Sequence, residues 1–128
     1  MKISVDTNVL VRIITNDNTE LAARAKNLVK KHGPKEVFLP YGVILEVYYV
    51  LTSVYEFSKE KALSVIEDTL KVEQFTCEHE VSIHLALAKS AKGFSFNDAL
   101  FGEIAGTRNI KMHTFDKGLR HNKNFEMI

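Results

Sequence analysis

The stretch VFLPYGVILEVYYVLTSVY, residues 37–55, contains the pattern that decides the fold class. Its first residues, Val37–Leu39, are apolar and are followed at once by Pro40, which predicts a short strand that ends there. The apolar run over residues 41–55 is too long for a strand, so we expect a buried helix. A strand that passes directly into a helix is the building unit of an α/β protein.

The rest of the chain alternates between strand-like and helix-like patterns in the same way. Residues 2–6 alternate polar and apolar and predict a strand, after which Thr7 or Asn8 can cap a helix over residues 9–14. Further helices are expected from residue 21 to the Gly33-Pro34 pair, from the capping Ser58 to Leu70, from Val81 through Leu85 and Ala88 to Gly93, and from the capping Asn97 to about Asn109; further strands are expected over residues 72–77, 110–114 and 125–127. Strands separated by helices require crossover connections, so we expect an α/β fold with a short, mainly parallel central sheet flanked by helices on both faces.

The composition is that of one ordinary globular domain. The chain has 128 residues, of which 45% are hydrophobic and 26% charged, which suits a single core over residues 1–128. The one cysteine, Cys77, excludes an internal disulfide, and we expect it to be a buried apolar side chain. The apolar runs are too short to cross a membrane and the first residues do not resemble a signal peptide, so we expect a cytoplasmic protein.

Three common catalytic patterns are absent from the sequence. No glycine-rich phosphate loop occurs, which excludes nucleotide binding of the P-loop type. His79 and His84 are one residue too far apart for the zinc-protease helix motif, and no cysteine pair is available for zinc. In the triplet DTN at residues 6–8, Asn8 replaces the second aspartate expected of an aspartyl phosphatase.

Four carboxylates stand at positions that the fold alone does not require. Asp6 ends the first predicted strand and Asp116 follows the strand over residues 110–114, so both belong at the carboxyl edge of a parallel sheet. Glu46 is the only charged residue of the opening stretch, and Asp98 begins a helix that is otherwise apolar at this end. A buried, unpaired carboxylate is costly, so we expect Glu46 to be protonated, paired or bound to a cation.

Each acid also has a structural explanation, and the sequence leaves these explanations open. Asp6 can cap a helix, Asp116 can belong to a turn, and Asp98 can interact with a helix dipole. Glu46 can pair with a buried Arg12. The joint pattern favours a shared site, because carboxylates gathered together raise one another's pKa unless a hard divalent cation neutralises them.

Four sequence blocks together resemble a known family. They are DTNVLVR at residues 6–12, ILEV at 44–47, FNDAL at 96–100 and TFD at 114–116, and they occur in order over nearly the whole chain. In these blocks the chain resembles the VapC-type toxins of the PIN-domain family. The resemblance implies an endoribonuclease that uses Mg²⁺ or Mn²⁺ to hydrolyse RNA phosphodiester bonds.

The resemblance also implies which residues act. The catalytic and metal-binding acids would be Asp6, Glu46, Asp98 and Asp116, and of these we expect Asp6 and Asp98 to be the main metal ligands. Thr7, Asn8 and Thr114 would orient a carboxylate or a water. Basic residues expected to hold RNA, unless they simply form a solvated face, are Lys89, Lys92, Arg108, Lys117, Arg120 and Lys123.

Partners follow from the same resemblance. Family toxins form homodimers and are silenced by a small antitoxin whose C-terminal segment covers the acidic pocket. The chain departs from the family at Phe101-Gly102-Glu103, where relatives have an alanine-rich helix; Glu103 lies on a different helix face from Asp98, so it is not assigned to the site. The alternative is a catalytically inactive PIN-like module that binds RNA or protein, which the intact set of four acids disfavours.

Overall fold

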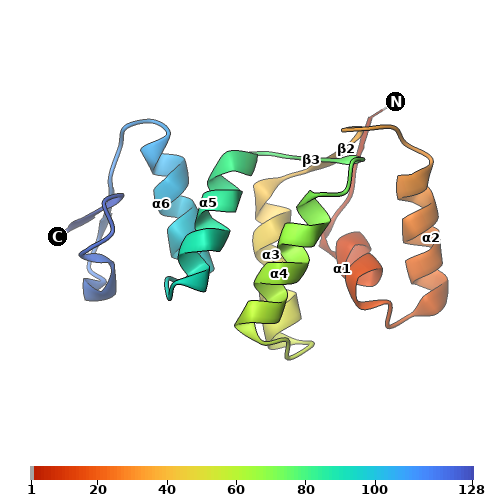
Figure 1. Cartoon of the computed structure of the whole chain (residues 1–128), viewed down its shortest axis with the longest axis horizontal. Helices are drawn as coiled ribbons and strands as arrows, with labels where there is room; N and C mark the ends of the chain where they lie inside the picture. Colours follow the sequence, from red (N-terminus) through yellow and green to blue (C-terminus); the bar gives the residue numbers. More distant parts are fainter. Residues whose placement is uncertain (1) are drawn as a thin grey trace. The chain divides into compact units, whose positions relative to one another are not determined.

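The computed structural model of the chain describes residues 2–128, which form two compact units, residues 2–80 and residues 81–128. The first unit contains, in chain order, β1 (Ile3–Ser4), α1 (Thr7–Thr15), α2 (Thr19–Lys30), β2 (Val37–Leu39), α3 (Tyr41–Ser53), α4 (Lys59–Leu70) and β3 (Phe75–Cys77) (Figure 1). The second contains α5 (Glu80–Ala91, whose first residue ends the first unit), α6 (Phe96–Gly106), β4 (Met112–Thr114), the 3-10 turn η1 (Lys117–Leu119) and β5 (Phe125–Met127). None of the helices within residues 2–128 has the length and apolar character needed to cross a membrane.

All strand pairs are parallel, as the crossover argument predicts. In the first unit the strand order is β1-β2-β3, and in the second β4 pairs with β5. The α/β class with parallel strands is therefore confirmed. The opening stretch also behaves as predicted, because β2 ends at Leu39 and α3 begins at Tyr41, on the far side of Pro40.

The sheet of the first unit buries alternate side chains. Val37 and Leu39 are buried in β2 while Phe38 between them is 40% exposed, and in β3 Phe75 and Cys77 are buried in the same way. Cys77 is therefore the buried apolar residue that the sequence predicts. Because strand side chains alternate between faces, this pattern gives the sheet one buried face and one more open face.

Two helix caps differ from the prediction. The side chain of Asp6 caps α1, which was the structural alternative left open for it, in place of Thr7 or Asn8; Ser95, not Asn97, caps α6. In both helices the structure starts one to two residues earlier than the apolar pattern suggested. Asparagine, aspartate and serine are about equally good caps, so the sequence could not decide between Asp6 and Asn8 or between Ser95 and Asn97.

The buried face of α5 does not include the apolar residues that mark this helix in the sequence. Val81 is 74% exposed, Leu85 is 48% exposed and Ala88 is exposed as well. The buried positions are instead Ser82, Ile83, Ala86, Leu87 and Ser90. Apolar residues occupy both sides of this helix, so helical spacing alone cannot identify the inner face.

Candidate active site

Asp6 lies at the carboxyl edge of the three-stranded sheet, as predicted. It lies two residues past the end of β1, and its Oδ1 accepts a hydrogen bond from the backbone N–H of Val9 at 3.1 Å, which caps α1. The carboxylate is exposed and its second oxygen has no partner among residues 2–128. One oxygen therefore holds the side chain in place and the other is available to a ligand.

Glu46 lies on α3, which begins at the same edge of the sheet one strand away. It is five residues past the first residue of α3, so it lies about 8 Å along the helix from that edge. The structure contradicts the expected burial, because Glu46 is exposed; the buried residues of α3 are Ile44, Val47 and Leu51 on another face. The run of apolar residues hid a narrow exposed stripe that contains Gly42, Glu46, Tyr49 and Ser53.

Glu46 does not form the ion pair with Arg12 that the sequence left open. Arg12 Nη1 instead contacts both oxygens of Asp17, at 2.9 and 3.1 Å. Within residues 2–128 the Glu46 side chain has neither a hydrogen bond nor an ion pair. Burial therefore does not force a cation onto Glu46, but within residues 2–128 the carboxylate has no basic partner that would neutralise it.

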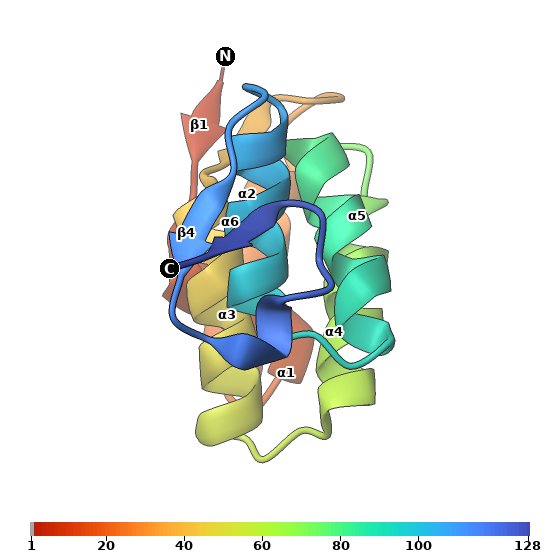
Figure 2. The same cartoon turned by 90° about the vertical axis from the view of Figure 1, so that its left-hand side faces the viewer.

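Asp98 and Asp116 lie toward one end of the second unit. Asp98 is in the first turn of α6, and Asp116 follows β4. α6 and β4 are successive elements that pack together and run in opposite directions. The first residues of α6 and the last residues of β4 therefore lie toward the same end of the second unit (Figure 2).

The local structure holds Asp116 firmly. Its Oδ1 accepts a hydrogen bond from the backbone N–H of Gly118 at 2.8 Å, and its own N–H donates to Thr114 Oγ1 at 3.0 Å. The turn that the sequence left open as an alternative is therefore present. Thr114 Oγ1 accepts the hydrogen bond from the backbone N–H of Asp116, and its expected role in orienting a carboxylate or a water stays a prediction.

The electrostatic surroundings of the four acids have one feature in common. Within residues 2–128, none of Asp6, Glu46, Asp98 and Asp116 forms an ion pair with Lys or Arg. Neither unit, among the residues that the structure describes, brings together three or more His, Cys, Asp or Glu side chains that could hold a metal ion. Each unit thus contributes one pair of carboxylates without basic partners.

The sequence matches the family model of the PIN domain over residues 3–124. The chain belongs to the PIN-domain family. Among solved structures it is similar to VapBC2 from Rickettsia felis bound to a DNA fragment from its promoter, with 18% identity, a TM-score of 0.42, and coverage of 100% of this chain and 98% of that chain. No curated protein matches the chain.

The basic residues expected to hold RNA are not equally available in this PIN domain. Lys89 forms an ion pair with Glu103, whose side chain is 11% exposed, and the same Glu103 Oε1 accepts a hydrogen bond from Asn124 Nδ2 at 3.1 Å. This ion pair connects α5 to α6. The exposed members of the predicted set are Lys92, Arg108, Lys117, Arg120 and Lys123.

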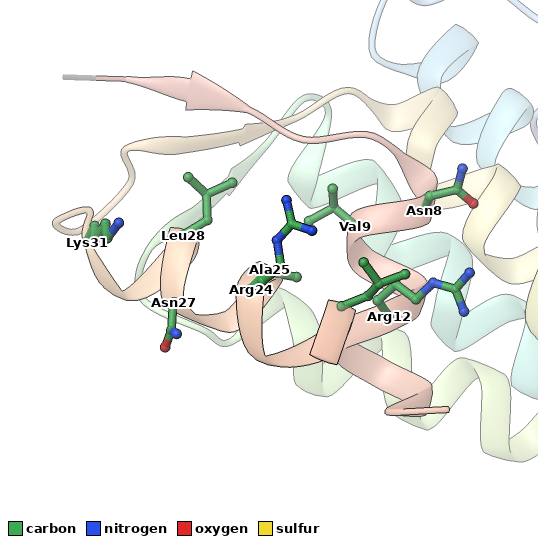
Figure 3. Close-up of a pocket in the computed structure, with 9 residues that line it drawn as sticks. Asn8, Val9, Arg12, Arg24, Ala25, Asn27, Leu28 and Lys31 are labelled. Carbon is green, nitrogen blue, oxygen red and sulfur yellow. The ribbon is translucent and has the colours of Figure 1, made fainter. Parts of the chain in front are cut away.

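A groove between α1 and α2 was missed by the sequence analysis. It has a volume of about 770 Å³ and is lined by Asn8, Val9, Arg12, Leu21, Arg24, Ala25, Asn27, Leu28 and Lys31. Asn8 and Lys31 lie at opposite ends, and Arg24 reaches from α2 toward Val9 of α1 (Figure 3). Neither Arg24 nor Lys31 has an acidic partner within residues 2–128. The groove therefore combines an apolar floor with free positive charge.

The candidate orienting residues beside Asp6 show no contact with it. Thr7 is half-buried, whereas Asn8 is exposed and lines the groove. Among residues 2–128, the hydrogen bond to Asp6 comes from Val9 and not from either side chain. Their roles stay predictions.

Proposed function

We propose that this PIN domain is a divalent-metal-dependent endoribonuclease and the toxin of a toxin–antitoxin pair. The observation that carries the proposal is the family match over residues 3–124 together with four family-pattern acids that lack basic partners in the described part of the chain. The residues proposed to act in catalysis are Asp6, Glu46, Asp98 and Asp116. An ion-paired set of acids would have favoured a structural role instead.

The donor set suits a hard divalent cation. Among residues 2–128, each of the four acids keeps at least one carboxylate oxygen without a protein partner, and such oxygens are the ligands that Mg²⁺ and Mn²⁺ prefer. Asp6 and Asp98 would be the main ligands, with Glu46 and Asp116 supporting a second ion or a water. When bound, the metal supplies charge neutralisation at the phosphodiester and a lowered pKa for water.

The residues of the chain would divide the remaining work between them. The backbone N–H groups of Val9 and Gly118 hold Asp6 and Asp116 in fixed orientations, which lowers the cost of assembling the site. Glu46 has no such restraint and can turn toward a water that attacks phosphorus. Exposed cations of the second unit would attract the RNA backbone, a contribution that weakens as salt rises.

The direct test is metal-dependent RNA cleavage by the purified chain. We expect degradation of single-stranded RNA in Mg²⁺ or Mn²⁺ and none after EDTA, with activity restored when excess metal is returned. Degradation that continues in EDTA would overturn the metal-dependent mechanism. RNA left intact in both metals, together with binding of RNA, would favour the inactive PIN-like module.

The groove between α1 and α2 offers a place for the antitoxin. Its apolar floor and its unpaired Arg24 and Lys31 suit an amphipathic segment with acidic side chains, and its Asn8 end lies next to Asp6 in the sequence. Charge reversal at both cations (Arg24→Glu, Lys31→Glu) should weaken binding of the protein encoded beside this chain's gene. The same change at Lys26 and Lys30, on the same helix but outside the groove, is the matched control.

The proposal also includes a homodimer, as the resemblance implies. Light scattering of the purified chain should give twice the mass of 14.5 kDa. A monomer at every concentration would remove this part of the proposal without affecting the catalytic part.

A further inference from the structure

Two aromatic rings and a carboxylate lie together at the carboxyl edge of the first unit's sheet. The rings of Tyr41 and His79 meet edge to face, with centroids 5.4 Å apart and an angle of 74° between planes. The backbone N–H of Tyr41 donates to Glu78 Oε1 at 3.2 Å. These contacts join the start of α3 to the end of β3, two segments far apart in the sequence.

The strand register relates this cluster to Asp6. Leu39 pairs with Cys77 and Ser4 pairs with Phe38, so continuing both ladders by one or two residues puts Asp6, Pro40 and Glu78 in one row. The hydrogen bond from Glu78 N–H to Leu39 O at 3.1 Å continues the β2–β3 ladder to this row. Neighbouring strands are about 4.8 Å apart, so Asp6 and Glu78 lie roughly 10 Å apart along the edge.

The cluster is exposed to solvent, and its carboxylate can accept further hydrogen bonds. His79 and Glu78 are exposed and Tyr41 is half-buried. Within residues 2–128, Glu78 has no Lys or Arg partner, and its Oε2 accepts no hydrogen bond. His79 also holds a left-handed backbone, with φ of 56°, which is uncommon for a residue with a side chain. The chain thus maintains an exposed ring in a backbone conformation that costs free energy.

We infer that Tyr41, Glu78 and His79 form a recognition site for one unpaired base of an RNA substrate, with guanine the best fit. Exposed aromatic and imidazole rings stack on unpaired bases, and a free carboxylate accepts hydrogen bonds from base amino and imino groups. Guanine presents two adjacent donors, N1–H and the N2 amino group, to such a carboxylate. Uracil presents one donor between two acceptors, which a carboxylate repels.

The surrounding charge favours a base over a phosphate. Glu78 and the exposed Glu80 flank His79, so an anionic phosphate would be repelled at this point. A phosphate would instead lie toward the proposed metal at Asp6, and the base of a nearby nucleotide would reach the rings. The inference rests on the proposed ribonuclease function, and it assigns that function a base preference.

Binding without cleavage tests the inference separately from the enzyme activity. The probe is a short fluorescent oligouridine RNA with one central guanosine, compared with the same RNA carrying uridine there, both titrated in EDTA against the full chain. We expect the guanosine RNA to bind roughly tenfold more tightly, because the Glu78 carboxylate can accept hydrogen bonds from guanine N1–H and the N2 amino group but faces acceptor oxygens in uracil. Equal affinity for the two RNAs would overturn the inference.

Three variants locate the effect. His79→Asn removes the ring but tolerates the left-handed backbone, and Glu78→Gln removes the charge; both should reduce the preference for guanosine. Glu73→Gln, an exposed acid just before the amino end of β3, should leave it unchanged and is the matched control. A preference that survives His79→Asn and Glu78→Gln in folded protein would contradict the assignment.

The two proposals fail in different ways. Cleavage of RNA in Mg²⁺ without any guanosine preference would disprove the base site and leave the ribonuclease intact. A guanosine preference in EDTA, accompanied by no cleavage in either metal, would disprove the ribonuclease and leave the base site.

Discussion

The two ends of α1 carry aspartates in opposite states. Asp17, just past the C-terminal end, accepts hydrogen bonds from Arg12, from Thr15 and, at 2.6 Å, from the hydroxyl of Tyr55. Asp6, at the N-terminal end, accepts one backbone hydrogen bond, and its other oxygen has no partner in the part of the chain that the structure describes. The oxygens of Asp17 accept hydrogen bonds that stabilise the fold, whereas Asp6 keeps an oxygen that a ligand can bind. The same helix thus separates structural from candidate functional acids by the number of partners each has.

Titration reflects the state of Asp17. The hydrogen bond from Tyr55, followed by that from Arg12, lowers the pKa of Asp17 to about 2 from its ordinary 3.8. The pKa of Tyr55 is raised for the same reason, because its hydroxyl donates to the Asp17 carboxylate. The pair connects the end of α1 to the loop after α3, so it contributes to the fold of the first unit.

The largest expected effect separates activity from stability. Asp98→Asn should lower the rate of RNA cleavage by a factor of roughly 1,000 or more while the melting temperature changes little, because the lost charge has no protein partner. Asp17→Asn should do the reverse: cleavage persists and the melting temperature falls. Both are measured by cleavage rates in Mg²⁺ and by thermal unfolding. Wild-type cleavage by Asp98→Asn would remove that residue from the site.

A second saturated acid allows a test in the other unit. Glu103 pairs with Lys89 and accepts a hydrogen bond from Asn124, and it is mostly buried. Glu103→Gln should lower the free energy of unfolding by about 1–3 kcal/mol, since it leaves Lys89 without its counter-charge. Urea unfolding measures the change, and Glu126→Gln, an exposed acid 3.7 Å from Lys111, is the control expected to have little effect. A loss no greater than that of the control would show that Glu103 is not structural.

The smallest expected effect is on the pH dependence of stability. The folded-state pKa of Asp17 is below its unfolded value, so its contribution is fully present above about pH 3.8 and is lost as pH falls toward about 2. The free energy of unfolding of wild type should therefore approach that of Asp17→Asn as the pH is lowered through this range. Thermal unfolding at a series of acidic pH values measures it. A difference that stays constant with pH would contradict the assignment.

Much of the fold could be predicted because local chemistry decides it. Pro40 separates β2 from α3 at the residue expected, and the alternation over residues 125–127 marks β5. The inner face of α5 could not be predicted, because apolar side chains lie on both sides of that helix. The exposure of Glu46 was hidden in the same way, since an exposed stripe of one acid and small or aromatic residues resembles a buried helix in sequence.

The candidate site was predictable residue by residue but not as an arrangement. The positions of Asp6 and Asp116 after parallel strands follow from the sequence pattern, and the structure agrees. The groove between α1 and α2 needs two helices to lie side by side, and the Tyr41–His79 contact needs β2 and β3 to be neighbours. Neither the packing of the two helices nor the pairing of the two strands can be predicted from a local sequence pattern. The joint action of all four acids stays a prediction.

Metal binding to the free acids is the most direct measurement of the central claim. With Mn²⁺ in excess, the melting temperature of the wild-type chain should rise by roughly a few degrees, because a ligand that binds the folded state stabilises it. The rise should persist in Asp17→Asn and be lost in Asp6→Asn and in Asp98→Asn. The account would be contradicted if Mn²⁺ left the melting temperature of wild type unchanged, or if it raised the melting temperatures of Asp6→Asn and Asp98→Asn as much as that of wild type.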